Sequence, residues 1–156
     1  MAILKMFVVV IVLVVGIVFY TLYRNGAHLS ESPGAMKRLG VFLSINSATT
    51  SDDHPFAELR TPVFAMDAGE LYQRALNTGS ELGWGILAND KDRHDVNFIV
   101  RSPVFLFEDD VYLEVKTIGT NQSSLYMQSS SRTGRADFAA NSGNIQKFVK
   151  HLKAKK

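Results

Sequence analysis

The first hydrophobic pattern along the chain is an unbroken apolar run near its N-terminus. Met6–Leu22 contains no charged residue, and as a helix it spans about 26 Å, close to the thickness of a bilayer hydrocarbon core. Tyr20 and Tyr23 stand where an interfacial aromatic belt is expected, and Arg24 follows at the level of the headgroups. Because an isolated segment in lipid must satisfy its own backbone hydrogen bonds, we predict one transmembrane helix within residues 1–24.

Two other interpretations of this run are weaker. A cleaved signal peptide needs small residues at a cleavage site, whereas the run ends in Tyr20-Thr21-Leu22-Tyr23-Arg24-Asn25. A buried core helix would carry a polar face, and none is present. We therefore interpret residues 1–24 as an uncleaved signal-anchor that leaves the protein single-pass in the membrane.

The side of the membrane is not fixed by the flanking charges. Lys5 and the α-amino group precede the run, while Arg24, Lys37 and Arg38 follow it, so the positive-inside rule gives nearly balanced counts. The short N-terminal stub before the apolar run is typical of an export signal. This favours a periplasmic or extracytoplasmic position for the rest of the chain.

After the apolar run the composition changes. Residues 25–60 are rich in Ser, Gly, Asp and Thr and include Pro33 and Pro55. Such a composition predicts an irregular linker, which could wrap partly around the folded part. We place the domain itself at residues 61–156.

Two helices are predicted in this domain. Asp67 and Glu70 have the spacing of a capping box, and apolar residues at helical spacing follow, so we expect a helix over Ala68–Thr78 with Gly79 just beyond its end. The second helix carries a C-terminal apolar stripe and is weak before Asn144, because Gly143 disfavours helix by about 1 kcal/mol. The stripe consists of Phe138, Ile145, Phe148, Val149 and Leu152.

The region between these helices alternates as strands do. Val111, Leu113 and Val115 point one way while the polar residues between them point the other, which predicts a strand with one buried face. We expect further strands at Trp84–Ala88, around Val96, Phe98 and Val100, in the apolar run Val104–Glu108 and at Ser123–Ser131, with turns at 89–94 and 119–122. Consecutive short strands without crossover helices predict an α+β fold. It has an antiparallel sheet of about four to five strands with both helices on one face.

Charge and composition narrow the function classes. The net charge is +2, but five lysines lie in the last ten residues, so the rest of the chain is net acidic. Lysines there complement the C-terminal end of a helix dipole and do not form the basic face of a nucleic-acid reader. The chain has no cysteine, which excludes disulfide and thiol chemistry.

One strand-to-helix corner combines residues suited to an anion. Arg132 and Arg135 supply forked donors and Gly134 allows a tight turn, so with Asn141 they form our candidate site for a phosphate or carboxylate. The alternative is structural. In that case the two arginines pair with Asp109, Asp110 or Asp137 and lock the corner.

The remaining candidates for chemistry are weaker. Asp109 and Asp110 could act as an acid/base pair, but neighbours on a strand point to opposite faces, so a turn or an ion pair, with Arg101 as partner across a hairpin, is favoured. Asp90–Asp95 departs from a calcium loop because Asp95 replaces the required glycine. The four histidines have no zinc spacing, so we expect no metal and no cofactor.

Several motifs resemble a known family. They are Gly83-Trp84, Phe105-Leu106-Phe107-Glu108-Asp109-Asp110-Val111 and Ser131-Arg132-Thr133-Gly134-Arg135-Ala136-Asp137, followed by Asn141 and Ile145. Over about Thr61 to Leu152 the chain resembles the domain of unknown function 1499 family. The resemblance implies a domain associated with an envelope or an organelle and brings no established activity. Many members carry cysteines ahead of the domain, where this chain has Ser44-Ile45-Asn46-Ser47, and Ala136 stands where a serine is common.

The sequence thus predicts a membrane-anchored cell-envelope protein, as a non-catalytic accessory or ligand-binding module. Whether it is an enzyme is left open. The alternatives are a hydrolase or other enzyme acting on an anionic envelope substrate, and a lipid-binding carrier whose aromatic side chains line an apolar cavity. The expected partners are the membrane, an anionic or lipid-like small molecule and other envelope proteins, with no nucleic acid.

Overall fold

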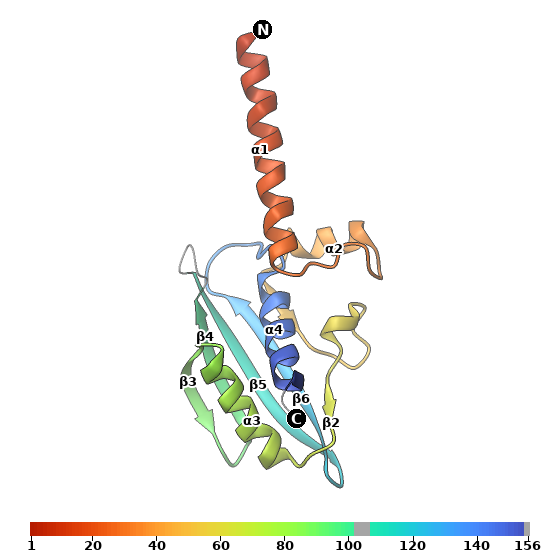
Figure 1. The fold of residues 1–156 in the computed structure, drawn as a ribbon, viewed down its shortest axis with the longest axis vertical. Helices are drawn as coiled ribbons and strands as arrows, with labels where there is room; N and C mark the ends of the chain where they lie inside the picture. Colours follow the sequence, from red (N-terminus) through yellow and green to blue (C-terminus); the bar gives the residue numbers. More distant parts are fainter. Residues whose placement is uncertain (102–106, 155–156) are drawn as a thin grey trace.

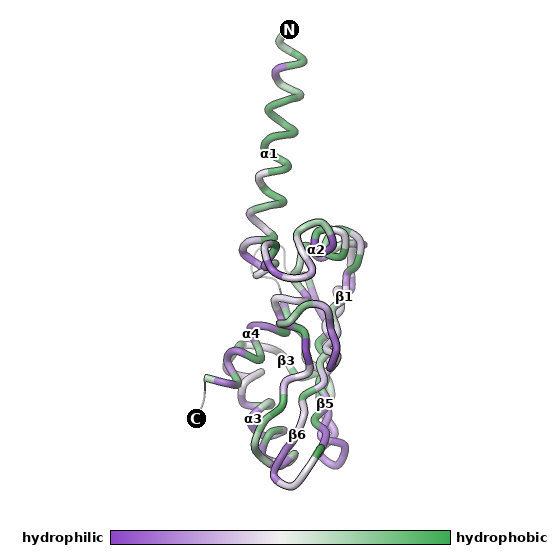
Figure 2. The backbone as a smooth tube through the Cα atoms, turned by 90° about the vertical axis from the view of Figure 1, so that its right-hand side faces the viewer, coloured by the Kyte–Doolittle hydropathy of each residue, from purple (hydrophilic) through white to green (hydrophobic). Residues whose placement is uncertain are grey.

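The apolar N-terminal run folds as one helix, α1 (Ala2–Arg24), that projects from the rest of the molecule (Figure 1). The computed structural model describes residues 1–101 and 107–154, and within them α1 is the one helix long and apolar enough to cross a membrane. Figure 2 shows that the projecting length is hydrophobic almost throughout. An N-terminal helix of this kind is compatible with a membrane anchor or a signal sequence.

The domain is built on one antiparallel sheet with the strand order β1-β6-β5-β4-β3. A short sixth strand, β2, also pairs with β6, so β1 and β2 occupy different stretches of the same edge. The α+β prediction is confirmed. The strands are β1 (Ser47–Thr49), β2 (Val63–Phe64), β3 (Gly85–Asp90), β4 (Asp95–Arg101), β5 (Glu108–Gly119) and β6 (Gln122–Ser131).

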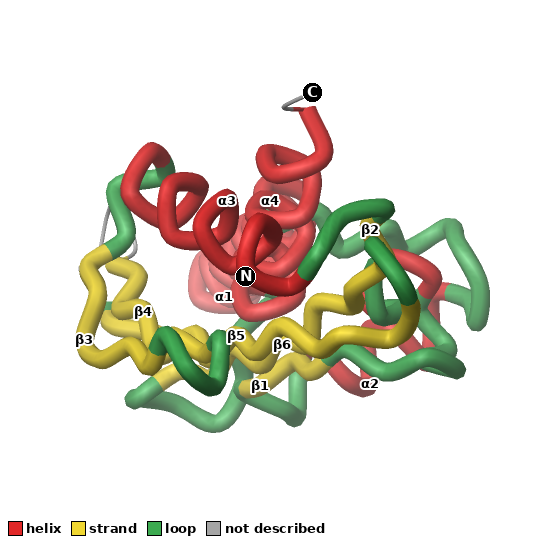
Figure 3. The backbone as a smooth tube through the Cα atoms, turned by 90° about the horizontal axis from the view of Figure 1, so that it is seen from below, coloured by secondary structure: helices red, strands yellow, loops and turns green. Residues whose placement is uncertain are grey.

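The helices α3 (Ala68–Glu81) and α4 (Ala140–Ala154) cover one face of the sheet, as predicted (Figure 3). Their core partners on β5 are Val111, Leu113 and Val115, all buried as the alternation requires. Aromatic rings fill the space between the layers. Trp84 stacks on Phe148 at 5.3 Å between centroids, and Phe98 meets Trp84 edge-on at 5.7 Å.

The beginning of α3 follows the prediction and its end does not. Asp67 caps the helix by accepting the Glu70 N–H at 2.9 Å, but the helix continues past Gly79 to Glu81, and Gly83 takes the left-handed conformation after it. The reason is packing, since a Cβ on Gly79 would lie 2.3 Å from the Phe98 ring. Gly79 therefore allows a close helix–strand contact and is not a helix terminator.

The last helix also departs from expectation. It begins at Ala140, ahead of Asn144, and Gly143 lies inside it. A Cβ on Gly143 would lie 2.7 Å from the carbonyl oxygen of Asn25. The glycine thus admits the chain that leaves α1, and this contact offsets its poor helix propensity.

Residues 25–60 contain more regular structure than an irregular linker. They include α2 (Ala35–Phe42), the strand β1 and a 3-10 turn, η1 (Ala57–Leu59). Arg38 is fully buried in this segment, and Phe42 and Phe56 join the core. Of the predicted run Val104–Glu108, residues 104–106 lie outside the described residues.

Candidate functional site

At the corner with the two arginines, Arg132 is held by ion pairs on the sheet face opposite the helices. Arg132 donates to both Asp110 oxygens, with Nε–Oδ2 at 2.9 Å and Nη2–Oδ1 at 2.7 Å, and to Glu108 at 2.6 Å. The hydrogen bond to Asp110 is the main reason that the pKa of Arg132 is raised. Two carboxylates already neutralise this guanidinium, so the geometry favours the structural alternative, and the anion site stays a prediction.

The acidic pair of β5 is divided between the two faces of the sheet. Asp109 is buried towards α4, where it accepts from Asn144 at 3.0 Å, whereas Asp110 is on the open face with Arg132. The two carboxylates therefore do not converge. Arg101 lies across the hairpin, as expected, but its partner is Glu108, at 2.9 Å.

Asn141 is fully buried and its side-chain hydrogen bonds are satisfied. Its amide donates to the Asn46 carbonyl at 2.7 Å and to Ser131 at 3.0 Å, and its oxygen accepts from Ser129 at 2.6 Å. These bonds join three parts of the chain, namely β6, Asn46 just before β1, and α4. Asn141 consequently holds elements together, and its side chain has no remaining donor for a ligand.

Gly134 and Arg135 belong to the exposed turn that leads towards α4. Gly134 takes a left-handed φ of 89°, and its carbonyl accepts from Asn46 at 2.8 Å. Arg135 is exposed, and no ion pair joins it to another described residue. Of the four predicted anion-site residues, Arg135 is thus the one whose charge remains available.

Asp137 begins α4. Its two oxygens accept the backbone N–H groups of Ala139 and Asn141, at 3.0 and 2.8 Å. Burial raises the pKa of the Asp137 carboxyl, although these hydrogen bonds oppose the shift. Phe138 and Ala139 follow with left-handed φ values of 50° and 68°, an uncommon conformation for residues with side chains.

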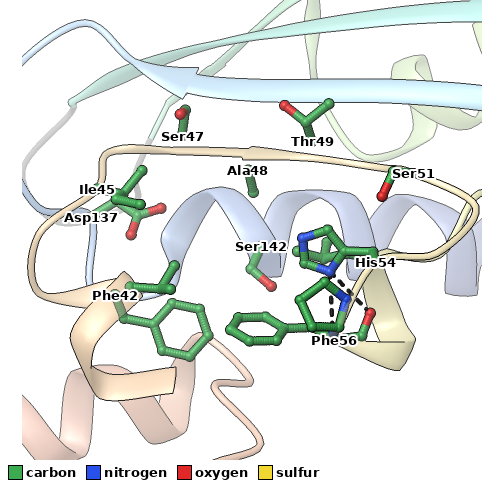
Figure 4. Close-up of a pocket in the computed structure, with 13 residues that line it drawn as sticks. Phe42, Ile45, Ser47, Ala48, Thr49, Ser51, His54, Phe56, Asp137 and Ser142 are labelled. Atoms are coloured by element: carbon green, nitrogen blue, oxygen red, sulfur yellow. Dashed lines mark hydrogen bonds between the residues drawn. The ribbon is translucent and has the colours of Figure 1, made fainter. Parts of the chain in front are cut away.

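A cavity of about 330 Å³ adjoins this helix start, between α4 and residues 41–59 (Figure 4). Its walls are mainly apolar, with the rings of Phe42 and Phe56 meeting edge-on at 5.6 Å. Ser47, Ala48 and Thr49 all line it, but only the side chain of Ala48 points into the cavity, and those of Ser47 and Thr49 point to the other side of β1. This volume lies within the range of small-molecule sites.

Polar groups stand at both ends of the cavity. Asp137 lies at one end, and His54 lies towards the other with Ser142 between them (Figure 4). His54 Nδ1 lies 3.0 Å from the Phe56 backbone nitrogen and 3.2 Å from the Phe56 carbonyl oxygen, so the backbone of Phe56 engages this ring nitrogen. In a hydrolytic triad the corresponding nitrogen donates to a carboxylate, and among the described residues no carboxylate pairs with His54.

Sequence reasoning missed this cavity because its walls come from the segment predicted to be a linker. The signal that could have revealed it is the apolar content of Val41-Phe42-Leu43 and Phe56 within a polar stretch. Among the described residues no group of three or more His, Cys, Asp or Glu side chains is arranged to hold a metal ion.

Comparison with known proteins adds one relationship. No curated protein matches the chain significantly. The sequence profile of the family described as Protein of unknown function (DUF1499) matches residues 42–152, which include β1 to β6, α3 and most of α4. The match covers well over half of the chain and agrees with the resemblance carried by the motifs, so the protein belongs to this family of unknown function.

Proposed function

We propose that the protein is a membrane-anchored, non-catalytic ligand-binding module of the cell envelope, and that the cavity beside α4 is its binding site. The observation that carries the proposal is the cavity itself, with walls formed by Phe42, Ile45, Ala48 and Phe56 and a few polar groups at its ends. Sites for small molecules combine a mainly apolar lining with a small number of placed polar groups.

The charged corner argues against the enzyme alternative. An enzyme acting on an anionic substrate would keep Arg132 available, but Arg132 is held by Asp110 and Glu108. The lipid-carrier alternative would need an apolar cavity lined by aromatic side chains between the sheet and the helices. It is likewise not favoured, because Trp84, Phe98 and Phe148 pack against one another there.

The joint between α1 and the domain supports an anchor that is retained. Leu22, in the last turn of α1, is fully buried in the domain core, and Val18 packs against that core. The Asn25 amide donates to the Phe138 carbonyl at 2.9 Å, and Gln146 donates to the Gly26 carbonyl at 3.1 Å. Cleavage within this region would remove part of the core, so we infer a single-pass protein.

We place the domain on the extracytoplasmic side. A reporter enzyme that is active only outside the cytoplasm, fused after Lys156, tests this placement. Activity of that reporter is the expected result, and activity of a cytoplasm-only reporter instead would reverse the orientation.

Binding can be tested with the full chain in phosphatidylcholine nanodiscs. With benzene as the probe, the methyl NMR signal of Ile45, which lines the cavity, should shift saturably, while that of the core residue Ile145 should not. Ala48→Phe fills the cavity and should abolish the shift. Thr49→Phe, its neighbour on β1 pointing the other way, is the matched control and should retain it.

Two outcomes would contradict the proposal. The first is a wild-type Ile45 signal that does not saturate with benzene. The second is an equal loss of the shift in both phenylalanine variants, since that would trace the effect to β1 and not to the cavity.

A further inference from the structure

The cavity continues towards the surface of α2. A second hollow of about 430 Å³ lies next to it and includes Pro33 and Lys37 in its lining. The cavity and this second hollow lie side by side, because they share the lining residues Val41, Ile45, Pro55 and Phe56. A ligand in the inner cavity thus has a path of apolar side chains leading to Lys37.

This path ends near the membrane helix. In two perpendicular views α2 lies at the level where α1 enters the domain (Figures 1 and 2). Arg38 of α2 fixes that position, since it donates to the Ala27 carbonyl at 3.3 Å and to the Ser32 carbonyl at 2.7 Å. Its guanidinium also lies 4.2 Å from the centre of the Phe56 ring, so one buried residue joins the chain leaving α1 to the cavity wall.

The outer surface around α2 has the character of a membrane-contacting surface. Met36 is 83% exposed, Leu43 46% and Ile45 44%, and the exposed Lys37 stands among them. Exposed apolar side chains beside a cation suit the interface of a bilayer with anionic headgroups.

The polar groups inside the cavity are already engaged within the protein. Both Asp137 oxygens accept backbone N–H groups, from Ala139 just before α4 and from Asn141 within it. The Ser142 hydroxyl accepts from Gln146 at 3.1 Å. What the inner cavity offers to a ligand is mainly its apolar wall. An anionic group at the Asp137 end would also meet a carboxylate, so a charged head belongs at the Lys37 end.

We propose that the cavity takes one acyl chain of an anionic phospholipid from the leaflet beside α2, with Lys37 contacting the headgroup phosphate. This deepens the proposed function, on which it rests, because it assigns a ligand class to the same cavity. The helix α1 then has a second role, because it holds the opening of the cavity beside the bilayer that supplies the lipid.

The test uses the full chain in nanodiscs that contain phosphatidylglycerol with a photoreactive diazirine near the end of one acyl chain. Peptide mapping by mass spectrometry should find cross-links within residues 41–59 as well as in α1. Ala48→Phe should reduce the cross-links in 41–59 to background, and Thr49→Phe should leave them unchanged. Lys37→Gln should lower the preference for phosphatidylglycerol over phosphatidylcholine about fivefold.

Lys153→Gln is the control for charge, because Lys153 lies in the last turn of α4, at the end of the domain away from α1 (Figure 1). Cross-links confined to α1, or cross-links in 41–59 that persist in Ala48→Phe, would overturn the inference. A diazirine-labelled fatty acid that labels the cavity when the phospholipid does not would overturn it as well. If only the ligand class were wrong, the benzene-dependent shift of the Ile45 signal would still be observed together with any of these three results.

Discussion

The guanidinium of Arg38 and the carboxylate of Glu58 form a double hydrogen bond next to the cavity, with Nη1–Oε1 at 2.5 Å and Nη2–Oε2 at 3.1 Å. Arg38 is fully buried, and Glu58 is 13% exposed at its side chain. The pair joins α2 to η1, and the remaining Arg38 donors hold the carbonyls that follow α1. The segment that leaves α1, the helix α2 and the cavity wall therefore depend on one buried charge.

Replacement of Arg38 should destabilise the fold strongly. Arg38→Met keeps most of the side-chain volume but leaves Glu58 and the Ser32 carbonyl without their donor. Because one partner of a buried pair then remains uncompensated, the free energy of unfolding should fall by about 3 kcal/mol. The fluorescence of Trp84, the single tryptophan and 7% exposed, reports unfolding in denaturant.

Arg60→Met is the matched control for this substitution. Arg60 is exposed and donates to the His54 carbonyl at 3.3 Å from the same segment. Its loss should leave the denaturation midpoint almost unchanged. Equal midpoints for the two variants would show that the buried pair does not hold the segment in place.

The burial of Arg38 is also the feature that could not be predicted from the sequence. Periodicity identified β5 because Val111, Leu113 and Val115 alternate locally, and a local rule suffices for such a strand. Arg38 is buried only because Glu58, 20 positions away, and backbone carbonyls 6 to 11 positions before it surround its guanidinium. A polar residue whose partners lie outside its own helix leaves no periodic pattern, so residues 25–60 looked like a linker.

The charged corner was more accessible to sequence reasoning. A high density of carboxylates near two arginines was enough to raise an ion-pair lock as the alternative to an anion site. Arg132 pairs with Asp110 as that alternative expected, whereas Arg135 pairs with no carboxylate among the described residues. The role of Asn141 was not accessible. It depends on Asn46, 95 positions away, which a family motif alone does not connect to it.

Asp137 should make the folded protein more stable in mild acid than at neutral pH. Its pKa in the folded state is raised by burial, so the folded state binds the proton more tightly than the unfolded state. The contribution of Asp137 to stability is therefore present below its unfolded pKa and is lost as the pH rises through the folded pKa. Asp137→Asn should remove this loss of stability with rising pH, as measured by denaturant titrations between the unfolded and the folded pKa. Carboxyl-carbon NMR should place the titration midpoint of Asp137 in the folded protein above the ordinary aspartate value.

Glu58 supplies a contrast of opposite sign. Burial opposes its ionisation, but the hydrogen bond and the charge of Arg38 outweigh burial and lower its pKa. Its contribution is present above the unfolded pKa and is lost as the pH falls through the folded pKa. If Glu58→Gln and Asp137→Asn changed the pH dependence in the same direction, one of the two assignments would be wrong.

Two glycines in helices should respond in opposite ways to alanine. Gly143→Ala places a Cβ against the Asn25 carbonyl and should lower the free energy of unfolding by about 1–3 kcal/mol, because backbone must move to admit it. In Gly40→Ala the new Cβ meets nothing within 4 Å, so the gain in helix propensity should raise stability by about 0.5–1 kcal/mol. A neutral Gly143→Ala would mean that α1 leaves the domain without the close contact to α4.

The anion-site prediction can be decided by changing the carboxylates that hold Arg132. In the wild type, inorganic phosphate should not shift the backbone amide NMR signals of Arg132 and Arg135 saturably, because Asp110 and Glu108 already occupy the Arg132 donors. The double variant Glu108→Gln with Asp110→Asn removes both negative charges and should acquire phosphate binding at the same amides. Adding Arg132→Ala to that variant should abolish the new binding, whereas adding Arg135→Ala should only weaken it. Saturable phosphate binding by the wild type would instead favour a functional anion site, since phosphate would then compete successfully with two carboxylates that are already in place.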